Sequence, residues 1–470
     1  MGQEIETSHF HHEEFRRFYA ALHTETLLLQ KRMRDGAFSE RSYQAGLELE
    51  LCLVDASYEP APRNEEVLTS LQDSNVVMEL SKYNLEFNVD PAPLVEIGIA
   101  TLAHRMQNLW RRCQQVAGAF DLHLVTTGIL PTLQDEDLTL QSMSNSLRYR
   151  ALNEQVLRLR RGKPVRLDID GLESVISEHR DVMLEAAATS FQLHLQVPFS
   201  KISQALNWST ILSAPLVAIS ANSPLLFHRP LWSETRIPLF EQAVSIAGPI
   251  GRVTLGTGYV KDVHDCFLEN QSLFPVLLPI ACSDQPAHFS HVKLHNGTIW
   301  RWNRPILGND PDGTPHVRLE QRVMPAGPSM LDMEAQMAFF YGLMIDLLEG
   351  PTIDFDERLP FLFAWDNFYQ SARMGLRSSV HWIDGKKWPV VKLMHDVLVP
   401  AADRGLGYLG VDATVSNRWL GIITDRMIKE QNGATWQLEF WERSGRDPNV
   451  LVREYVARQA TGEPVHTWSL

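Results

Sequence analysis

The sequence contains few cysteines and no paired cysteine motif. Its four cysteines lie far apart, and none has the C-x-x-C spacing that is typical of a zinc site or a redox-active pair. A disulfide framework is therefore not expected, and a reducing cytoplasm is the simplest expectation for the compartment. The first residues are acidic and contain no apolar segment that would predict a secretory signal.

Positive charge and long apolar runs are also scarce. The chain has 43 Lys and Arg against 57 Asp and Glu, a formal net charge of −14, which argues against binding to nucleic acid or to an anionic membrane. The most apolar stretch, 206–226, is interrupted by asparagines, serines and a proline, so it does not predict a membrane span. No Walker A motif occurs, which excludes a P-loop as the phosphate-binding device. Small-molecule substrates are the expected partners, and a homo-oligomer is compatible with the sequence.

Helical and strand-like segments are mixed without regular βα alternation, which predicts an α+β fold with an antiparallel sheet. We expect an N-terminal helical arm over 1–43, a catalytic domain over 44–380 and a C-terminal helical subdomain over 381–470 packed on it. Apolar spacing predicts helices over 9–35, 94–120, 145–161, 203–220, 330–349 and 361–376, and strands over 43–55, 76–80, 85–89, 122–127, 189–197, 291–302 and 316–323.

The strongest local signal is a pair of glutamates, Glu48 and Glu50, in the alternating segment 43–55. Side chains of a strand alternate between its two faces, so both carboxylates point to the same side, roughly 6–7 Å apart. Two exposed glutamates on a strand are also common without any function. The functional interpretation is favoured because further acidic segments of the same character follow in the chain.

Glu79 and Glu86 stand on either side of a predicted turn, and a hairpin would bring them together. His194 lies on the polar side of the strand 189–197, where a structural role is the ordinary alternative. Glu320 and Arg322 share one face of the strand 316–323, where a surface ion pair is the alternative.

Converging carboxylates repel one another unless a cation neutralises them. Mg²⁺ or Mn²⁺ would do so with oxygen ligands and one imidazole, and such ions bridge the phosphates of ATP in phosphoryl transfer. An arginine would complete the site, and both Arg322 and Arg236 are candidates.

The order of these segments resembles the glutamate–cysteine ligase family, in particular its bacterial carboxylate–amine ligase branch, which is related to glutamine synthetase. Six short motifs between about residue 44 and residue 380 carry the resemblance. They contain Glu48 and Glu50, Glu79 and Glu86, His194, the segment Ala218–Pro224 followed by Arg236, the pair Glu320 and Arg322, and the segment Trp365–Leu376.

The resemblance implies a curved, funnel-like antiparallel sheet that holds the metals, with helices packed outside, as in the glutamine synthetase-like catalytic fold. It also implies that a γ-glutamyl phosphate forms from glutamate and ATP and is then attacked by an amine such as cysteine. Two or three Mg²⁺ ions, or Mn²⁺, would be bound by Glu48, Glu50, Glu79, Glu86, His194 and Glu320.

By the same resemblance, Arg322 would stabilise the transferred phosphoryl group and Arg236 would bind the substrate carboxylate, with Asn222 and Gln192 also contacting substrate. Gln192 departs from the family pattern, which often has a histidine there. Two alternatives remain: a family member without catalysis that binds or senses a metabolite, and a metal-dependent amidohydrolase that needs no ATP.

Overall fold

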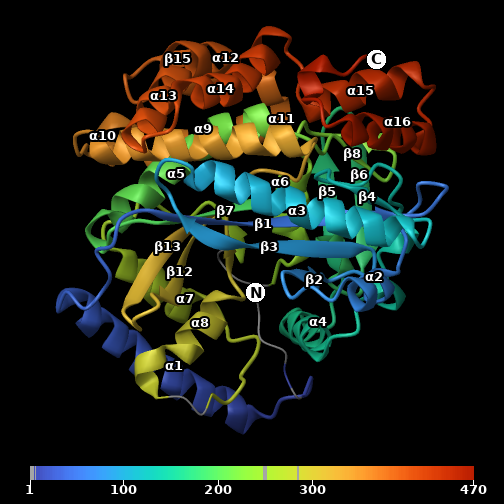
Figure 1. Cartoon of the computed structure of the whole chain (residues 1–470). Coiled ribbons are helices and arrows are strands. Elements are labelled where there is room, and N and C mark those ends of the chain that lie inside the picture. The colour runs from blue at the N-terminus through green and yellow to red at the C-terminus, as the bar shows by residue number, and fades with distance from the viewer. Residues whose placement is uncertain (1–4, 6, 247–250, 283–284) are drawn as a thin grey trace.

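The centre of the fold is a seven-stranded antiparallel sheet (Figure 1). A computed structural model describes residue 5 and residues 7–246, 251–282 and 285–470 of the chain, so most of the acidic start lies outside the described residues. The strand order is β12-β13-β7-β1-β3-β2, and β4 pairs with the end of β1. The predicted α+β class with a curved antiparallel sheet is confirmed. The strands are β1 (Gln44–Val54), β2 (Val76–Met78), β3 (Asn84–Pro93), β4 (His123–Val125), β7 (Phe191–Gln196), β12 (Asn303–Asn309) and β13 (Pro315–Gln321).

The sheet has one apolar and one polar face. The side chains of each strand alternate between the two faces, and the pairing register places apolar residues beside apolar ones and polar residues beside polar ones. Leu49 of β1 lies opposite Phe87 of β3 and Phe191 of β7, and all three are fully buried. The neighbouring position, Glu50, points to the other face together with its partner Glu86. A truncation such as Leu49→Ala would leave a cavity in the apolar layer, at a cost of about 2–5 kcal/mol.

Three long helices cover the apolar face: α3 (Gly98–Gly118), α5 (Ile202–Ser220) and α9 (Met330–Glu349) (Figure 1). The α9 helix begins at a capping box, in which the Ser329 hydroxyl accepts from the Asp332 amide. Farther along this helix, the Tyr341 hydroxyl donates to the backbone carbonyls of Gly46 and His194, both at 3.0 Å. A hydroxyl has one proton, so these two contacts share it, and they fix α9 against two adjacent strands.

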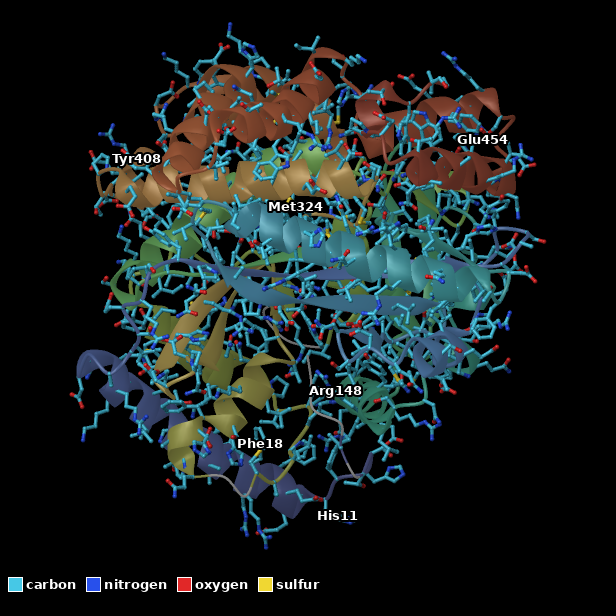
Figure 2. The ribbon with its side chains drawn as sticks, in the orientation of Figure 1. His11, Phe18, Arg148, Met324, Tyr408 and Glu454 are labelled. Atoms are coloured by element: carbon cyan, nitrogen blue, oxygen red, sulfur yellow. The ribbon has the colours of Figure 1, made fainter. Side chains whose placement is uncertain are left out.

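The helices α1 (His12–Arg34), α4 (Leu147–Leu159), α7 (Val263–Leu273) and α8 (Ser290–Asn296) lie on the other side of the sheet (Figure 1). The C-terminal helices α13 (Val399–Tyr408), α14 (Ala413–Ile428), α15 (Gly433–Arg443) and α16 (Pro448–Thr461) lie beyond the apolar side. Figure 2 shows this separation through Phe18 of α1 and Tyr408 at the end of α13.

A fully buried ion pair, Arg426–Asp332 at 2.6 Å, joins α14 to the start of α9. The C-terminal helices therefore share buried contacts with the central part of the chain, and the division at residue 380 stays a prediction.

The remaining elements include α2 (Asn64–Leu71), β5 (Val165–Asp170), β6 (Ser174–His179), α6 (Arg236–Ala243), β11 (Trp300–Arg301), α10 (Phe355–Arg358), α11 (Phe361–Met374), β14 (Ser379–His381), β15 (Lys387–Pro389) and α12 (Val390–Leu393).

The predicted strand over 291–302 is wrong for its first half, because residues 291–296 belong to helix α8, and only Trp300–Arg301 of the segment form a strand, β11. Its residues alternate in polarity, but the buried carboxylate of Glu25 from α1 accepts from the amides of His291 and Val292 at 2.9 and 3.0 Å. The same carboxylate pairs with Nδ1 of His291 at 2.6 Å. This contact caps the first turn of the helix, and residues 266 positions apart make it, so no local pattern indicates it.

One helical segment, Phe199–Ser220, is long and apolar enough to cross a membrane by length and composition. However, 89% of its apolar window is buried inside the protein, as expected for the core helix α5.

Candidate active site

The polar face of the sheet brings together side chains from four strands that are distant in sequence. Glu48 of β1 lies opposite Gln192 of β7, and Glu50 lies opposite Glu86 of β3. On the far side of β7, His194 lies opposite Glu320 of β13. Because paired residues point to the same face, the predicted metal ligands from these strands form one continuous surface.

Glu48, His194 and Glu320 form a compact group in which the candidate ligand atoms all lie within 4.8 Å of one another. It is the one such group of three or more side chains found among the described residues. Nε2 of His194 lies 3.4 Å from the Glu48 carboxylate and 3.7 Å from that of Glu320, and it is buried without a hydrogen-bond partner. Burial lowers the pKa of His194 to about 4, so the imidazole is neutral, the form that binds metals. Two carboxylates and one imidazole are a donor set that Mg²⁺ or Mn²⁺ accepts.

Glu320 is held by two arginines. The Arg304 guanidinium from β12 donates to both of its oxygens, at 2.7 and 2.9 Å, and Arg322 donates to one of them at 3.1 Å. Burial alone would raise the pKa of Glu320, but the two guanidinium charges outweigh it and hold the pKa well below its usual range. Arg304 is not among the site residues predicted from the sequence.

Glu50 and Glu86 face each other directly across β1 and β3, with Glu79 just beyond the end of β2. Burial, followed by the negative charge of Glu79, raises the pKa of Glu50 to about 7. Burial and the charges of Glu48, Glu79 and Glu50 raise the pKa of Glu86 well above its ordinary value. Repulsion of this kind is what a bound cation would relieve.

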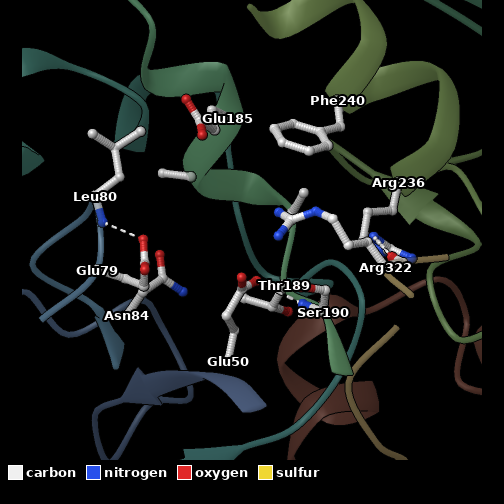
Figure 3. Close-up of a pocket in the computed structure, with 12 residues that line it drawn as sticks. Glu50, Glu79, Leu80, Asn84, Glu185, Thr189, Ser190, Arg236, Phe240 and Arg322 are labelled. Atoms are coloured by element: carbon white, nitrogen blue, oxygen red, sulfur yellow. Dashed lines mark hydrogen bonds between the residues drawn. The ribbon is translucent and has the colours of Figure 1, made fainter. Parts of the chain in front are cut away.

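A pocket lies next to these carboxylates (Figure 3). Gln192 connects the acidic and basic sides of the site: its amide nitrogen donates to Glu50 at 2.8 Å, and its amide oxygen accepts from Arg322. The pocket is lined by Glu50, Glu79, Leu80, Asn84, Glu185, Ala186, Ala188, Thr189, Ser190, Arg236, Phe240 and Arg322.

Of the two remaining predicted residues, Arg236 reaches the pocket and Asn222 does not. Arg236 lines the pocket, but its guanidinium already donates to Glu234 at 3.1 Å and to the backbone carbonyls of Arg322 and Val323. Two of its five N–H groups remain for a ligand. Asn222 is not a lining residue, and its fully buried amide bonds to Ala326, Tyr455 and Gln437 instead. The structure therefore does not bring Asn222 to the site.

Glu185 is a site residue that is not among those predicted from the sequence. It belongs to the short 3-10 helix η3 (Met183–Ala187), which precedes β7, and it lines the pocket beside Glu79. Burial and the charge of Glu79 raise its pKa to about 8. Its segment is too short for a periodic pattern, so no local signal in the sequence indicates this role.

A model of glutamate–cysteine ligase family 2 matches residues 44–415 of the chain. The match includes all the predicted metal ligands and both predicted arginines. A search among curated proteins finds no significant match.

Two solved structures are similar in fold. A glutamate–cysteine ligase from Francisella tularensis, solved in complex with AMP, has a TM-score of 0.52 at 12% identity, and the alignment covers 92% of this chain and 96% of that one. A bifunctional glutathione synthetase from Pasteurella multocida has a TM-score of 0.51 at 11% identity, covering 92% of this chain and 55% of the other. At such identities the similarity shows the fold alone.

Proposed function

Because the chain belongs to glutamate–cysteine ligase family 2, we propose that it is an ATP-dependent carboxylate–amine ligase that forms a γ-glutamyl amide. The observation that supports this most directly is the Glu48–His194–Glu320 group, with its unpartnered imidazole nitrogen. A buried histidine nitrogen without a partner is costly, and a metal ion in this position would remove the cost.

The donor atoms of the Glu48–His194–Glu320 group, which all lie within 4.8 Å of one another, fit a divalent cation. Glu48, His194 and Glu320 would hold one ion, and Glu50, Glu79 and Glu86 would hold a second. When bound, Mg²⁺ would neutralise the ATP phosphates and favour transfer of the terminal phosphoryl group.

Arg322 is the protein group best placed to stabilise charge on that phosphoryl group. It lies between Glu320 and Gln192 and lines the pocket, so its guanidinium is fixed before substrates bind. In the proposed reaction an oxygen of the γ-carboxylate of glutamate attacks the terminal phosphorus, and the bond between phosphorus and the ADP oxygen breaks. The amine nitrogen then attacks the acyl carbon, the bond to phosphate breaks, and the nitrogen loses a proton.

The test is ADP release by the full chain in the presence of MgCl₂, ATP and glutamate, with a panel of amines and mass spectrometry of the products. Cysteine is the first acceptor to examine, followed by other amino acids and simple amines. We expect ADP, phosphate and a γ-glutamyl amide in equal amounts.

Two outcomes would overturn the proposal in different ways. ATP binding without ADP release, for every amine in the panel, would favour a metabolite-binding protein. Hydrolysis of a γ-glutamyl amide in the absence of ATP would favour a metal-dependent amidohydrolase.

A further inference from the structure

Glu185 is the acidic residue of the pocket that the proposed metal and phosphoryl sites do not use. Its Oε2 atom is buried, and no hydrogen-bond donor or ion-pair partner for this carboxylate occurs among the described residues. The charged groups around it are Glu79, Glu50, Arg322 and Arg148 of α4, and only the two arginines are cations. Neither arginine forms an ion pair with it. Figure 2 shows Arg148 on the α4 side of the sheet.

A second unpartnered group lines the same pocket. Nε of Arg322 is buried without an acceptor, in a side chain that is only 10% exposed. The pocket thus presents one unsatisfied acidic oxygen and one unsatisfied basic N–H. Buried charged groups of this kind are retained when a ligand supplies their partners.

The surroundings of Glu185 favour an organic cation over another metal ion. Glu185 lies off the sheet, outside the compact Glu48–His194–Glu320 group. Figure 3 shows it near the ring of Phe240, at the opposite end of the pocket from Glu50. Mg²⁺ keeps part of its water shell and prefers several oxygen ligands, whereas an ammonium group on a carbon chain is compatible with an aromatic wall.

We propose that Glu185 binds the ammonium group of the acceptor amine, next to the position where Arg322 meets the phosphoryl group. This inference rests on the proposed ligase function. It makes Glu185 a binding residue that places the incoming nitrogen beside the acyl phosphate, and it predicts that the acceptor enters the pocket as a cation. The ammonium group then passes one proton to the Glu185 carboxylate, which frees the lone pair that attacks the acyl carbon, and the second proton leaves the nitrogen as the bond to phosphate breaks. A carboxylate partner for an ammonium group is worth about 1.5–3 kcal/mol, which corresponds to a loss of about 10- to 150-fold in binding when it is removed.

The test compares Glu185→Gln with wild type, using L-cysteine or, if another amine releases ADP faster in the panel, that amine. We expect the KM for the amine to rise at least about tenfold, while the KM values for ATP and glutamate stay within about twofold. Glu178→Gln, which removes an exposed carboxylate from the neighbouring strand β6, is the matched control and should leave all three KM values unchanged.

Hydroxylamine separates acceptor binding from acyl phosphate formation, because it is uncharged at neutral pH and traps acyl phosphates as hydroxamates. Glu185→Gln should therefore keep wild-type hydroxamate formation from glutamate and ATP while it loses activity with the cationic amine. If the Gln variant does not fold, Glu185→Asp, which keeps the charge on a shorter chain, should show the same selectivity with a smaller rise in KM.

Three results would overturn the inference: an unchanged KM for the amine, a raised KM for glutamate instead, or a lower stoichiometry of bound Mn²⁺. The last two would assign Glu185 to the glutamate ammonium group or to a metal. Failure of the proposed function looks different, because wild type itself would then release no ADP with any amine.

Discussion

Arg318 donates its Nε–H to Nδ1 of His194, at 3.0 Å, from the strand next to it. Arginine stays protonated, so Nδ1 must be the acceptor and the neutral imidazole must carry its proton on Nε2. Nε2 is the atom that lies between Glu48 and Glu320, where a metal ion would need its lone pair. Metal binding by His194 therefore requires Arg318 to release Nδ1, so that the proton can move there.

Arg318→Gln should consequently tighten binding of Mn²⁺ by about 3- to 10-fold, since a glutamine oxygen can accept from Nδ1–H and the substitution also removes a positive charge. The measurement is an EPR titration of free Mn²⁺, which does not depend on turnover. Arg166→Gln, at an exposed arginine of β5, is the matched control. Equal or weaker binding in Arg318→Gln would show that this hydrogen bond does not oppose the metal.

Removal of the Glu320 charge should abolish most of the catalytic activity. Glu320→Gln weakens the proposed metal site and leaves Arg304 and Arg322 without the carboxylate that orients them. We expect ADP release to fall at least about 100-fold, because preorganised charges at the phosphoryl group contribute several kcal/mol. Steady-state ADP release measures this, and circular dichroism checks that the variant is folded. Activity within about threefold of wild type would contradict the assigned role.

The sheet and its acidic face could be predicted from sequence because both depend on alternation. In β1 the leucines and glutamates alternate without interruption, so the sequence alone predicts that Glu48 and Glu50 share one face. The hairpin of β2 and β3 pairs Glu86 with Val77 and leaves Glu79 just beyond the end of β2, near enough for its charge to raise the pKa of Glu86.

Features that depend on contacts between distant segments could not be predicted in this way. Arg304 lies in a strand in which Pro305 and Gly308 interrupt the pattern, and its role appears only when β12 pairs with β13. Glu185 lies in a single 3-10 turn. Asn222 belongs to a segment that resembles the family, but tertiary structure directs its amide to Tyr455 of α16.

The metal-free protein should lose stability as the pH rises from about 6.5 to about 8.5. The folded-state pKa values of Glu50 and Glu185, about 7 and about 8, lie above the ordinary value of a glutamate. The stabilising contribution of their protonated forms is complete only below the ordinary glutamate pKa, declines above it, and is lost once the pH has risen through the folded-state values. Burial lowers the pKa of His194 to about 4. Its titration therefore makes stability increase with pH, but only below about pH 6.5, which is outside this window.

The measurement is thermal unfolding in EDTA and in MgCl₂ across this window. We expect Mg²⁺ to raise the Tm by about 3–6 °C at pH 8.5 and by less at pH 6.5, because the cation replaces the protons. Glu50→Gln should reduce the pH dependence measured in EDTA, whereas Glu178→Gln should not. A Tm that rises with pH in EDTA would contradict the cited pKa shifts.

Asn222→Ala distinguishes a structural residue from a substrate-binding one. The side chain is fully buried, and its amide donates to the Ala326 carbonyl at 2.8 Å and to the Tyr455 hydroxyl at 2.9 Å, while it accepts from Gln437 at 2.8 Å. Loss of these bonds leaves buried groups unpaired, so we expect the free energy of unfolding to fall by about 2–4 kcal/mol in urea titrations. The KM values for ATP, glutamate and the amine should stay within about twofold, since no part of this side chain lines the pocket. Asn309→Ala, at an exposed asparagine, is the control for both measurements. A large rise in one KM with unchanged stability would instead support the role that family resemblance predicts for Asn222.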